Sequence, residues 1–333
     1  TWLFTTILRS HLEYDTLPWR NAAISGWVLD PDRKKMSKSK GNVVTPLPLL
    51  ERHGADSVRY WAASGRPGTD TAVDEGQMKV GRRLALKILN ASKFVIGRLG
   101  EDHAPPPAAV KTALDRDMLR RLVGVVDRAT AALAGFDYTR ALETTEEFFW
   151  SFCDDYVELV KSRAYGEPAE PATASARAAL ALALSVQLRL FAPFLPFVTE
   201  EVWSWWQEGS VHRSAWPDPA AEVGPALGAG PGAGASTGEG TASSPVLDMV
   251  AEVLGAIRRE KSDQKRSMRT PVARLSVTDR PARLALLDQA LGDLLEAGGI
   301  PPDRLATREG EPAVEVTLAP PEGDGTAGRP GSA

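Results

Sequence analysis

A short basic segment combines residue types that could bind an anionic group. It reads Lys35-Met36-Ser37-Lys38-Ser39, and Gly41 follows two positions later. Two ammonium groups three positions apart supply point charges, and the hydroxyl groups supply hydrogen-bond donors. Gly41 lets the backbone bend around such a group. The pattern suits a triphosphate whose charge shifts toward pyrophosphate when its α-phosphorus is attacked, although charge alone would be more typical of a solvated basic loop.

The elements around this segment are expected to hold it between a strand and a helix. Residues 22–29 read as a short apolar strand, which Asp30-Pro31-Asp32 interrupts. Thr45-Pro46 is typical of a helix start. Asp56 could cap a second helix, and residues 2–12 show helical spacing.

The middle of the chain predicts an antiparallel helical bundle. The expected helices cover about residues 75–99, 115–134, 138–164, 172–190 and 197–207. Trp150, Phe152 and Tyr156 lie at helical spacing, which favours core positions over stacking on RNA bases. The apolar stretch Ala178 to Val198 is interrupted by Gln187 and Arg189, so we expect a buried bundle helix, a soluble chain and no membrane partner.

The last third of the chain contains a change of composition. Residues 223–245 hold seven Gly and three Pro, which predicts a flexible linker over 221–245. A helical face beginning at Val246, a strand over 273–277, a helix over 284–295 and a second strand over 314–318 predict a small α+β domain at 246–320. Residues 321–333 are expected to be a disordered tail.

Composition excludes several classes of protein. The chain has 333 residues, 43% of them hydrophobic and 25% charged, which excludes a wholly disordered chain, a collagen or a coiled-coil rod. One cysteine, Cys153, excludes an internal disulfide framework and a zinc site built from several cysteines. The net charge of −4 gives no support for a uniformly basic nucleic-acid binder. No pair of histidines has metal-ligand spacing, so we predict no metal site.

A second basic cluster follows the linker. Six cations within 12 residues could contact an RNA backbone by displacing counterions, and a solvated helix end is an equally good interpretation. The six are Arg258, Arg259, Lys261, Lys265, Arg266 and Arg269.

The segment Lys35 to Ser39 matches, letter for letter, the KMSKS signature of class I aminoacyl-tRNA synthetases. The residues Gly26-Trp27-Val28-Leu29-Asp30 and Lys40-Gly41-Asn42-Val43-Val44 also resemble that family. Asn90-Ala91-Ser92-Lys93-Phe94 is similar to the valyl subgroup, and the stretch from Trp150 to Glu158 resembles a helix of the family's anticodon-binding bundle.

The resemblance implies a fold and an activity. It implies the C-terminal remainder of a Rossmann-type α/β catalytic domain at 1–65 and a helical anticodon-binding domain at 66–220, in a chain that is mainly α overall. It implies ATP-dependent activation of valine and its attachment to tRNA(Val), with ATP as a substrate accompanied by Mg²⁺. Lys35 and Lys38 would act at the triphosphate, and the further residues implied at the ATP site are Gly26, Trp27, Val28, Met36, Ser37 and Ser39.

The same resemblance leaves other interpretations open. An isoleucyl enzyme or a non-catalytic tRNA-binding module could carry the same loop. Because the chain starts at Thr1 and shows neither a His-Ile-Gly-His-like motif nor an editing domain, we expect a fragment that does not adenylate valine alone. A cytoplasmic monomer is the expected state of the parent enzyme.

Overall fold

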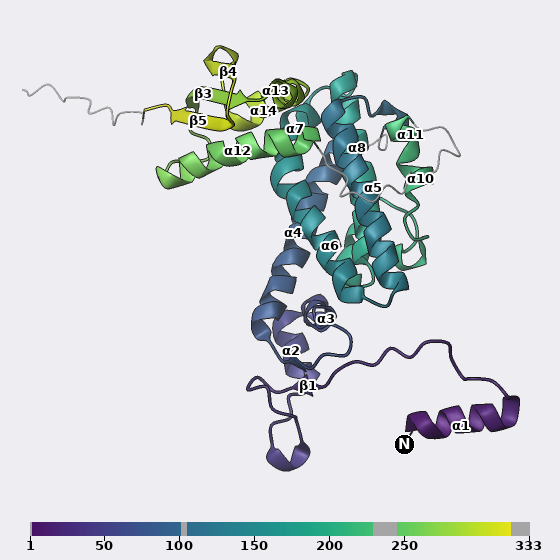
Figure 1. The fold of residues 1–333 in the computed structure, drawn as a ribbon. Helices are drawn as coiled ribbons and strands as arrows, with labels where there is room; N and C mark the ends of the chain where they lie inside the picture. The colour runs from purple at the N-terminus through teal and green to yellow at the C-terminus, as the bar shows by residue number, and fades with distance from the viewer. Residues whose placement is uncertain (1, 101–104, 229–244, 321–333) are drawn as a thin grey trace, which may run out of the picture.

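The N-terminal quarter of the chain holds short elements around one long loop. The computed structural model describes residues 2–100, 105–228 and 245–320. The first elements are α1 (Trp2–Tyr14), β1 (Val28–Leu29), the 3-10 turn η1 (Lys38–Lys40), α2 (Pro46–His53), α3 (Ala55–Ala63) and β2 (Thr71–Ala72). Helix α1 buries no residue and lies apart from the other helices in Figure 1.

The strand expected over 22–29 forms only at its last two residues. β1 pairs in parallel with β2, with Val28 opposite Thr71 and Leu29 opposite Ala72. The Thr71 N–H of β2 also donates to the carbonyl of Trp27 (2.9 Å), and the two-residue length of β2 limits how far the pairing continues toward residue 22. The two-stranded sheet is therefore a small anchor beneath the loop.

The helical bundle follows the pattern expected from the sequence. Its elements are α4 (Glu75–Leu99), η2 (Pro107–Ala109), α5 (Ala113–Ala134), α6 (Tyr138–Ser151), the π-helical turn η3 (Phe152–Tyr156), α7 (Val157–Tyr165), α8 (Pro171–Phe191), α9 (Pro196–Trp203), η4 (Val211–Arg213), α10 (Pro219–Glu222) and α11 (Gly224–Leu227). Asp74 caps α4 by accepting hydrogen bonds from the next backbone N–H groups. Helix α4 extends from the α2–α3 pair into the bundle (Figure 1).

The bundle core is formed by the aromatic and aliphatic residues that the periodicity indicated. Phe152 and Tyr156 are fully buried and their rings stack, which confirms them as core residues, while Trp150 is half-buried. Helix α8 is long and apolar enough to cross a membrane, but 78% of its apolar window is buried inside the bundle. It is therefore packed as a core helix, with Gln187 and Arg189 buried as well.

Asp56 does not cap its own helix, contrary to the sequence-based expectation. Its carboxylate instead accepts hydrogen bonds from the backbone N–H groups of Phe197 (3.1 Å) and Val198 (2.8 Å), at the start of α9. Arg59, one turn further along α3, donates to the carbonyl oxygens of Pro193 and Phe194. These contacts fasten α3 to the turn between α8 and α9.

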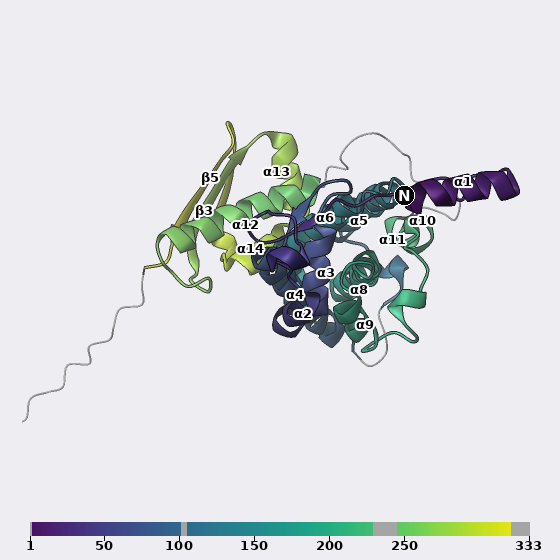
Figure 2. The same cartoon turned by 90° about the horizontal axis from the view of Figure 1, so that it is seen from below.

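The C-terminal part forms a three-stranded sheet covered by helices at one side of the bundle (Figures 1 and 2). Its elements are α12 (Pro245–Asp263), β3 (Val272–Asp279), α13 (Pro281–Asp288), α14 (Leu291–Gly298), η5 (Pro302–Arg304), β4 (Leu305–Glu309) and β5 (Ala313–Leu318). The strand order is β4-β3-β5, parallel for β3 and β4 and antiparallel for β3 and β5. Strand β4 and the division into α13 and α14 were not expected.

The linker expected over 221–245 is partly structured. Residues up to 228 belong to α10 and α11 or their ends, and Val223 and Ala226 are buried against the bundle. Their apolar side chains explain why the Gly-rich composition was misleading there. Residues 229–244, like the tail expected at 321–333, lie outside the described residues.

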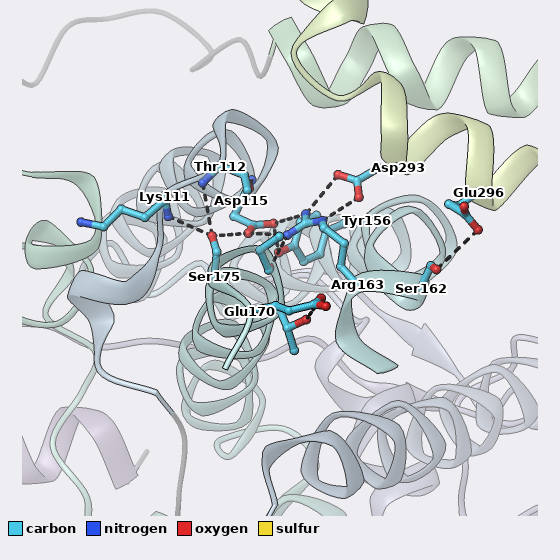
Figure 3. Close-up of polar contacts among 12 residues, drawn as sticks. Lys111, Thr112, Asp115, Tyr156, Ser162, Arg163, Glu170, Ser175, Asp293 and Glu296 are labelled. Atoms are coloured by element: carbon cyan, nitrogen blue, oxygen red, sulfur yellow. Dashed lines mark hydrogen bonds and ion pairs between the residues drawn. The ribbon is translucent and has the colours of Figure 1, made fainter. Parts of the chain in front are cut away.

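A half-buried cation joins the bundle to helix α14 of the C-terminal part (Figure 3). Arg163 of α7 donates to both carboxylate oxygens of Asp115 (3.1 and 2.8 Å) and to both of Asp293 in α14 (2.6 and 3.1 Å). Asp115 also accepts hydrogen bonds from the hydroxyl groups of Tyr156 and Ser175. With both carboxylates bound from several sides, the guanidinium fixes α14 against the bundle.

Candidate active-site loop

The basic loop leaves β1 and turns back on itself at once. The backbone N–H of Asp30 donates to the carbonyl of Lys34, and Leu29 forms an antiparallel bridge with Lys35. Arg33 adopts a positive φ of 62°, which closes this tight turn. The signature lysines thus begin directly beside the end of β1.

Two polar side chains hold the base of the loop. The carboxylate of Asp30 accepts hydrogen bonds from the backbone N–H of Lys34 (2.7 Å) and from the side-chain amide of Asn42 (2.7 Å). The oxygen of the Asn42 side chain accepts from the backbone N–H of Ser37 (3.0 Å). The Lys34 N–H first, and then the Asn42 amide, lower the pKa of Asp30, so this carboxylate is charged at neutral pH.

The second half of the signature forms one turn of 3-10 helix. Ser37 is its N-cap, and its hydroxyl accepts a hydrogen bond from the backbone N–H of Lys40 (3.3 Å). Gly41 closes the turn in the left-handed region at φ 68°, where a residue without a Cβ is favoured. The sequence Ser37 to Gly41 therefore specifies its own local fold.

The signature lysines are exposed and lack acidic partners. The ammonium of Lys35 lies 4.0 Å from the centre of the Trp27 ring, a cation–π distance. Among the described residues, neither Lys35 nor Lys38 forms an ion pair with a carboxylate. Their charge is therefore available to an external anion.

The residues expected to line the adenosine side lie next to the loop. Trp27 donates its backbone N–H to Asp70 (2.8 Å), and Gly26 packs so closely on the backbone of Thr69 that an added Cβ would lie 2.0 Å from its carbonyl oxygen. Trp27 and Val28 keep exposed side chains. The structure thus places Trp27 against Lys35 and Leu29 opposite Lys35 at the start of the signature segment.

A polar cleft of about 560 Å³ opens beside this assembly. Arg33, Arg66 and Asp70 line one side of the cleft, and Tyr60 of α3 and Glu146 of α6 line the other. The hydroxyl of Tyr60 donates to Glu146 (2.8 Å), and burial followed by this carboxylate raises the pKa of Tyr60. The signature lysines do not line the cleft.

The second basic cluster is not a single cationic face. The prediction that Lys261 contacts tRNA is wrong, because its side chain is buried. Its ammonium donates to the carbonyl oxygens of Met268 and Gly298. Burial, then the charge of Arg258, lowers the pKa of Lys261. Arg258 itself donates to the carbonyl of Asp154, and Arg266 to that of Ala319.

Three members of the cluster keep exposed side chains, namely Arg259, Lys265 and Arg269. Lys265 adopts a positive φ of 52° just after α12. The helical periodicity that placed Val253 and Ile257 inside the fold also places Lys261 inside, four residues after Ile257. That spacing was the available signal for its burial.

Several histidine and acidic side chains outside the lysine loop also have structural partners. His53 is buried and bonds to Glu75 (2.8 Å), and His212 bonds to the carbonyl of Pro196 (3.0 Å). Asp154 pairs with Lys87 (2.8 Å) and Glu158 with Lys161 (3.3 Å). In the parts of the chain that the structure describes, no group of three or more His, Cys, Asp or Glu side chains could hold a metal ion.

Comparison with known proteins shows which families the two main parts of the chain match. Residues 1–74 match the family described as tRNA synthetases class I (I, L, M and V), and residues 115–277 match the anticodon-binding domain of tRNA ligase. The agnB2 LeuRS of Agrobacterium radiobacter K84, crystallised in a ternary complex with tRNA and LeuAMS, shares the fold with a TM-score of 0.54 and 22% identity. That likeness covers 66% of this chain and 27% of the LeuRS chain.

The lysine loop and the helical bundle together define a class I tRNA synthetase, and the chain belongs to that family. Within it, the chain is similar to valine–tRNA ligases. The ligase of Salinispora tropica is 58% identical over 96% of this chain, and that of Thermobifida fusca is 58% identical over 97%. The chain spans 37% and 35% of the length of these two relatives.

Proposed function

We propose that the parent protein of this chain is a valine–tRNA ligase and that the chain carries its triphosphate loop and tRNA-binding bundle. The observation that carries the proposal is the loop itself. Lys35 and Lys38 present two exposed ammonium groups without carboxylate partners in the described residues, on a turn that Ser37 and Gly41 shape. Such a loop can complement the developing charge of a departing pyrophosphate.

The proposed reaction joins valine to AMP and then to tRNA. A carboxylate oxygen of valine attacks the α-phosphorus of ATP, the bond to the bridging oxygen breaks, and pyrophosphate leaves with its electron pair. Lys38, together with Lys35, stabilises that negative charge. The 3′-terminal ribose of tRNA(Val) then displaces AMP from the valyl-adenylate, and Mg²⁺ arrives with the nucleotide substrate.

The adenosine side of the proposed site is formed by the start of β1 and the two residues before it. Lys35 contacts the ring of Trp27, which stands between Gly26 and Val28 in the chain. Because Gly26 lies against the Thr69 backbone, a larger residue would displace this wall of the site. Met36, Ser37 and Ser39 complete the loop side, and Met36 accepts a hydrogen bond through its sulfur from the Val44 N–H (3.2 Å).

The tRNA contacts are proposed on two parts of the chain. The bundle, which matches an anticodon-binding domain, would meet the anticodon of tRNA(Val). Of the second basic cluster, Arg259, Lys265 and Arg269 remain as exposed candidates for phosphate contacts. We further propose that residues 1–65 complete a Rossmann-type catalytic domain, and that the parent enzyme is a cytoplasmic monomer.

The test is valine-dependent ATP–pyrophosphate exchange by the full-length parent and its Lys38→Ala variant. Removing one preorganised donor should cost about 3 kcal/mol of transition-state stabilisation, or roughly 150-fold in rate. A variant rate within threefold of the wild type would contradict the role of Lys38.

Isoleucine in place of valine separates the second candidate from the first. The relatives named above are valine–tRNA ligases, which favours valine. Exchange with isoleucine instead would move the assignment within the family. Exchange with neither amino acid would favour a tRNA-binding module.

A further inference from the structure

The lysine loop is closed at its base by one pair of side chains, Asp30 and Asn42. These residues stand 12 positions apart, on either side of the signature, yet their side chains bond at 2.7 Å. The Asn42 amide also donates to the carbonyl of Lys35 (3.2 Å). Asp30 is only 6% exposed, although nearly all of the loop around it is exposed.

Few other contacts fix the direction of the loop. Within the described residues, the segment 31–41 contains no buried side chain. Apolar packing therefore contributes little to its position, and its hydrogen bonds must do so. The Asp30–Asn42 pair reaches three backbone groups of the loop: the N–H of Lys34, the carbonyl of Lys35 and the N–H of Ser37.

We propose that Asp30 and Asn42 are positioning residues of the lysine loop. The pair holds Lys35 and the cap of the Lys38 turn in one fixed relation to β1, so that both ammonium groups reach the same triphosphate. The catalytic consequence rests on the proposed function, but the structural part does not. A preorganised loop need not be ordered again at each turnover, which preserves transition-state stabilisation.

The donor and acceptor pattern of the pair gives a sharp test. In the Asp30→Asn variant, two amide N–H donors face each other across the pair. In the Asn42→Asp variant, two negatively charged carboxylates face each other. Each single variant therefore opens the pair. The double variant D30N/N42D restores one donor and one acceptor in reversed order, keeps the acceptors for the Lys34 and Ser37 N–H groups, and lacks only the donor to the Lys35 carbonyl.

The first measurement is the rate of tryptic cleavage after Lys35, Lys38 and Lys40 in the 333-residue chain. An opened loop should be cut about fivefold to tenfold faster in each single variant, because cleavage follows the population of the open form. The double variant should return to within about twofold of the wild type. Asp32→Asn, which makes the same charge change on an exposed side chain of the same turn, should cleave at the wild-type rate.

The second measurement is pyrophosphate exchange by the full-length parent carrying the same variants. Each single variant should lower kcat by about tenfold and leave the KM for valine unchanged, and the double variant should recover most of kcat. Thermal unfolding of the bundle should be the same in all variants, which assigns the effect to the loop.

Two results would overturn the proposal: single variants cleaved at the wild-type rate, or a double variant no better protected than the singles. If the wild-type parent shows no exchange, the proposed function fails while the cleavage pattern still decides the role of the pair. If cleavage responds and kcat does not, the pair orders the loop without positioning it for catalysis, and the proposal fails in that part.

Discussion

The guanidinium of Arg163 and the ammonium of Lys38 carry the same charge in opposite surroundings. Arg163 lies between two carboxylates, those of Asp115 and Asp293, each within 2.8 Å at its nearest oxygen (Figure 3). Lys38 stands on an exposed turn without a carboxylate partner in the described residues. The bundle neutralises its cation internally, whereas the loop leaves its cations to be neutralised by something else.

This difference separates a structural cation from a binding one. A buried ion pair needs full compensation, because an unpaired charge inside a protein is strongly destabilising. An exposed lysine lowers the stability of the fold very little, because water solvates its charge. Its interaction with an anion becomes strong only when the bound anion excludes that water. Removing Arg163 should therefore damage the fold, and removing Lys38 should damage only the chemistry.

The largest expected effect is that of Arg163→Met. It leaves the carboxylates of Asp115 and Asp293 buried without their counterion, which should lower the free energy of unfolding by about 3–5 kcal/mol. Urea denaturation of the 333-residue chain measures the change. Arg128→Met, on the exposed side of α5, is the control and should stay within about 0.5 kcal/mol of the wild type. Equal midpoints for the two variants would break the comparison.

An intermediate effect is expected at the joint between the two regions. Asp56→Ala removes the acceptor for the Phe197 and Val198 N–H groups at the start of α9, which should lower the free energy of unfolding by about 1–2 kcal/mol. The same denaturation experiment measures it. Asp56→Asn retains one side-chain acceptor and should lose less; a larger loss for Asn than for Ala would show that the cap is not the cause.

The smallest effect is expected in the loop. Lys35→Met removes the cation–π contact with Trp27, which is worth about 0.5–1 kcal/mol locally at an exposed site. Global unfolding should shift by less than about 0.5 kcal/mol, because this contact lies outside the buried core. Because the chain has nine tryptophans, the local change is measured as the difference in iodide quenching between each protein and its Trp27→Phe counterpart. A global loss as large as that of Arg163→Met would show that the loop lysines are structural after all.

The local fold of the lysine loop depends on nearer residues than the joints between the elements do. Local rules specify the turn from Ser37 to Gly41, where a hydroxyl cap and a left-handed glycine act within five residues. The bundle helices were likewise readable from the spacing of their apolar residues. Asp56 was misread because its partner is 141 positions away, and no local pattern distinguishes a cap for its own helix from a cap for another.

The same limit explains strand β4 and the partner of Lys261 in Gly298, although the helical spacing of Lys261 already indicated that its side chain is buried. The ammonium of Lys261 is held by two carbonyl oxygens, and one of them belongs to Gly298, 37 positions later. Strand β4 alternates weakly, because its last three residues are exposed, and only its pairing with β3 reveals it. These features depend on contacts between residues far apart in the sequence, and such contacts form only when the chain folds.

Helix α4 connects the bundle to the β1–β2 pair, so a tilt of the helix at one end displaces its other end. Its 25 residues span about 37 Å at 1.5 Å each, from Glu75, three residues after β2, to Leu99 in the bundle. A tilt of about 3° at the bundle end moves the other end by about 2 Å, which is enough to displace a reacting group from its productive geometry. A small shift of the helices that surround Ile88 and Val95 therefore causes a larger displacement of the β1–β2 pair, from which the lysine loop extends.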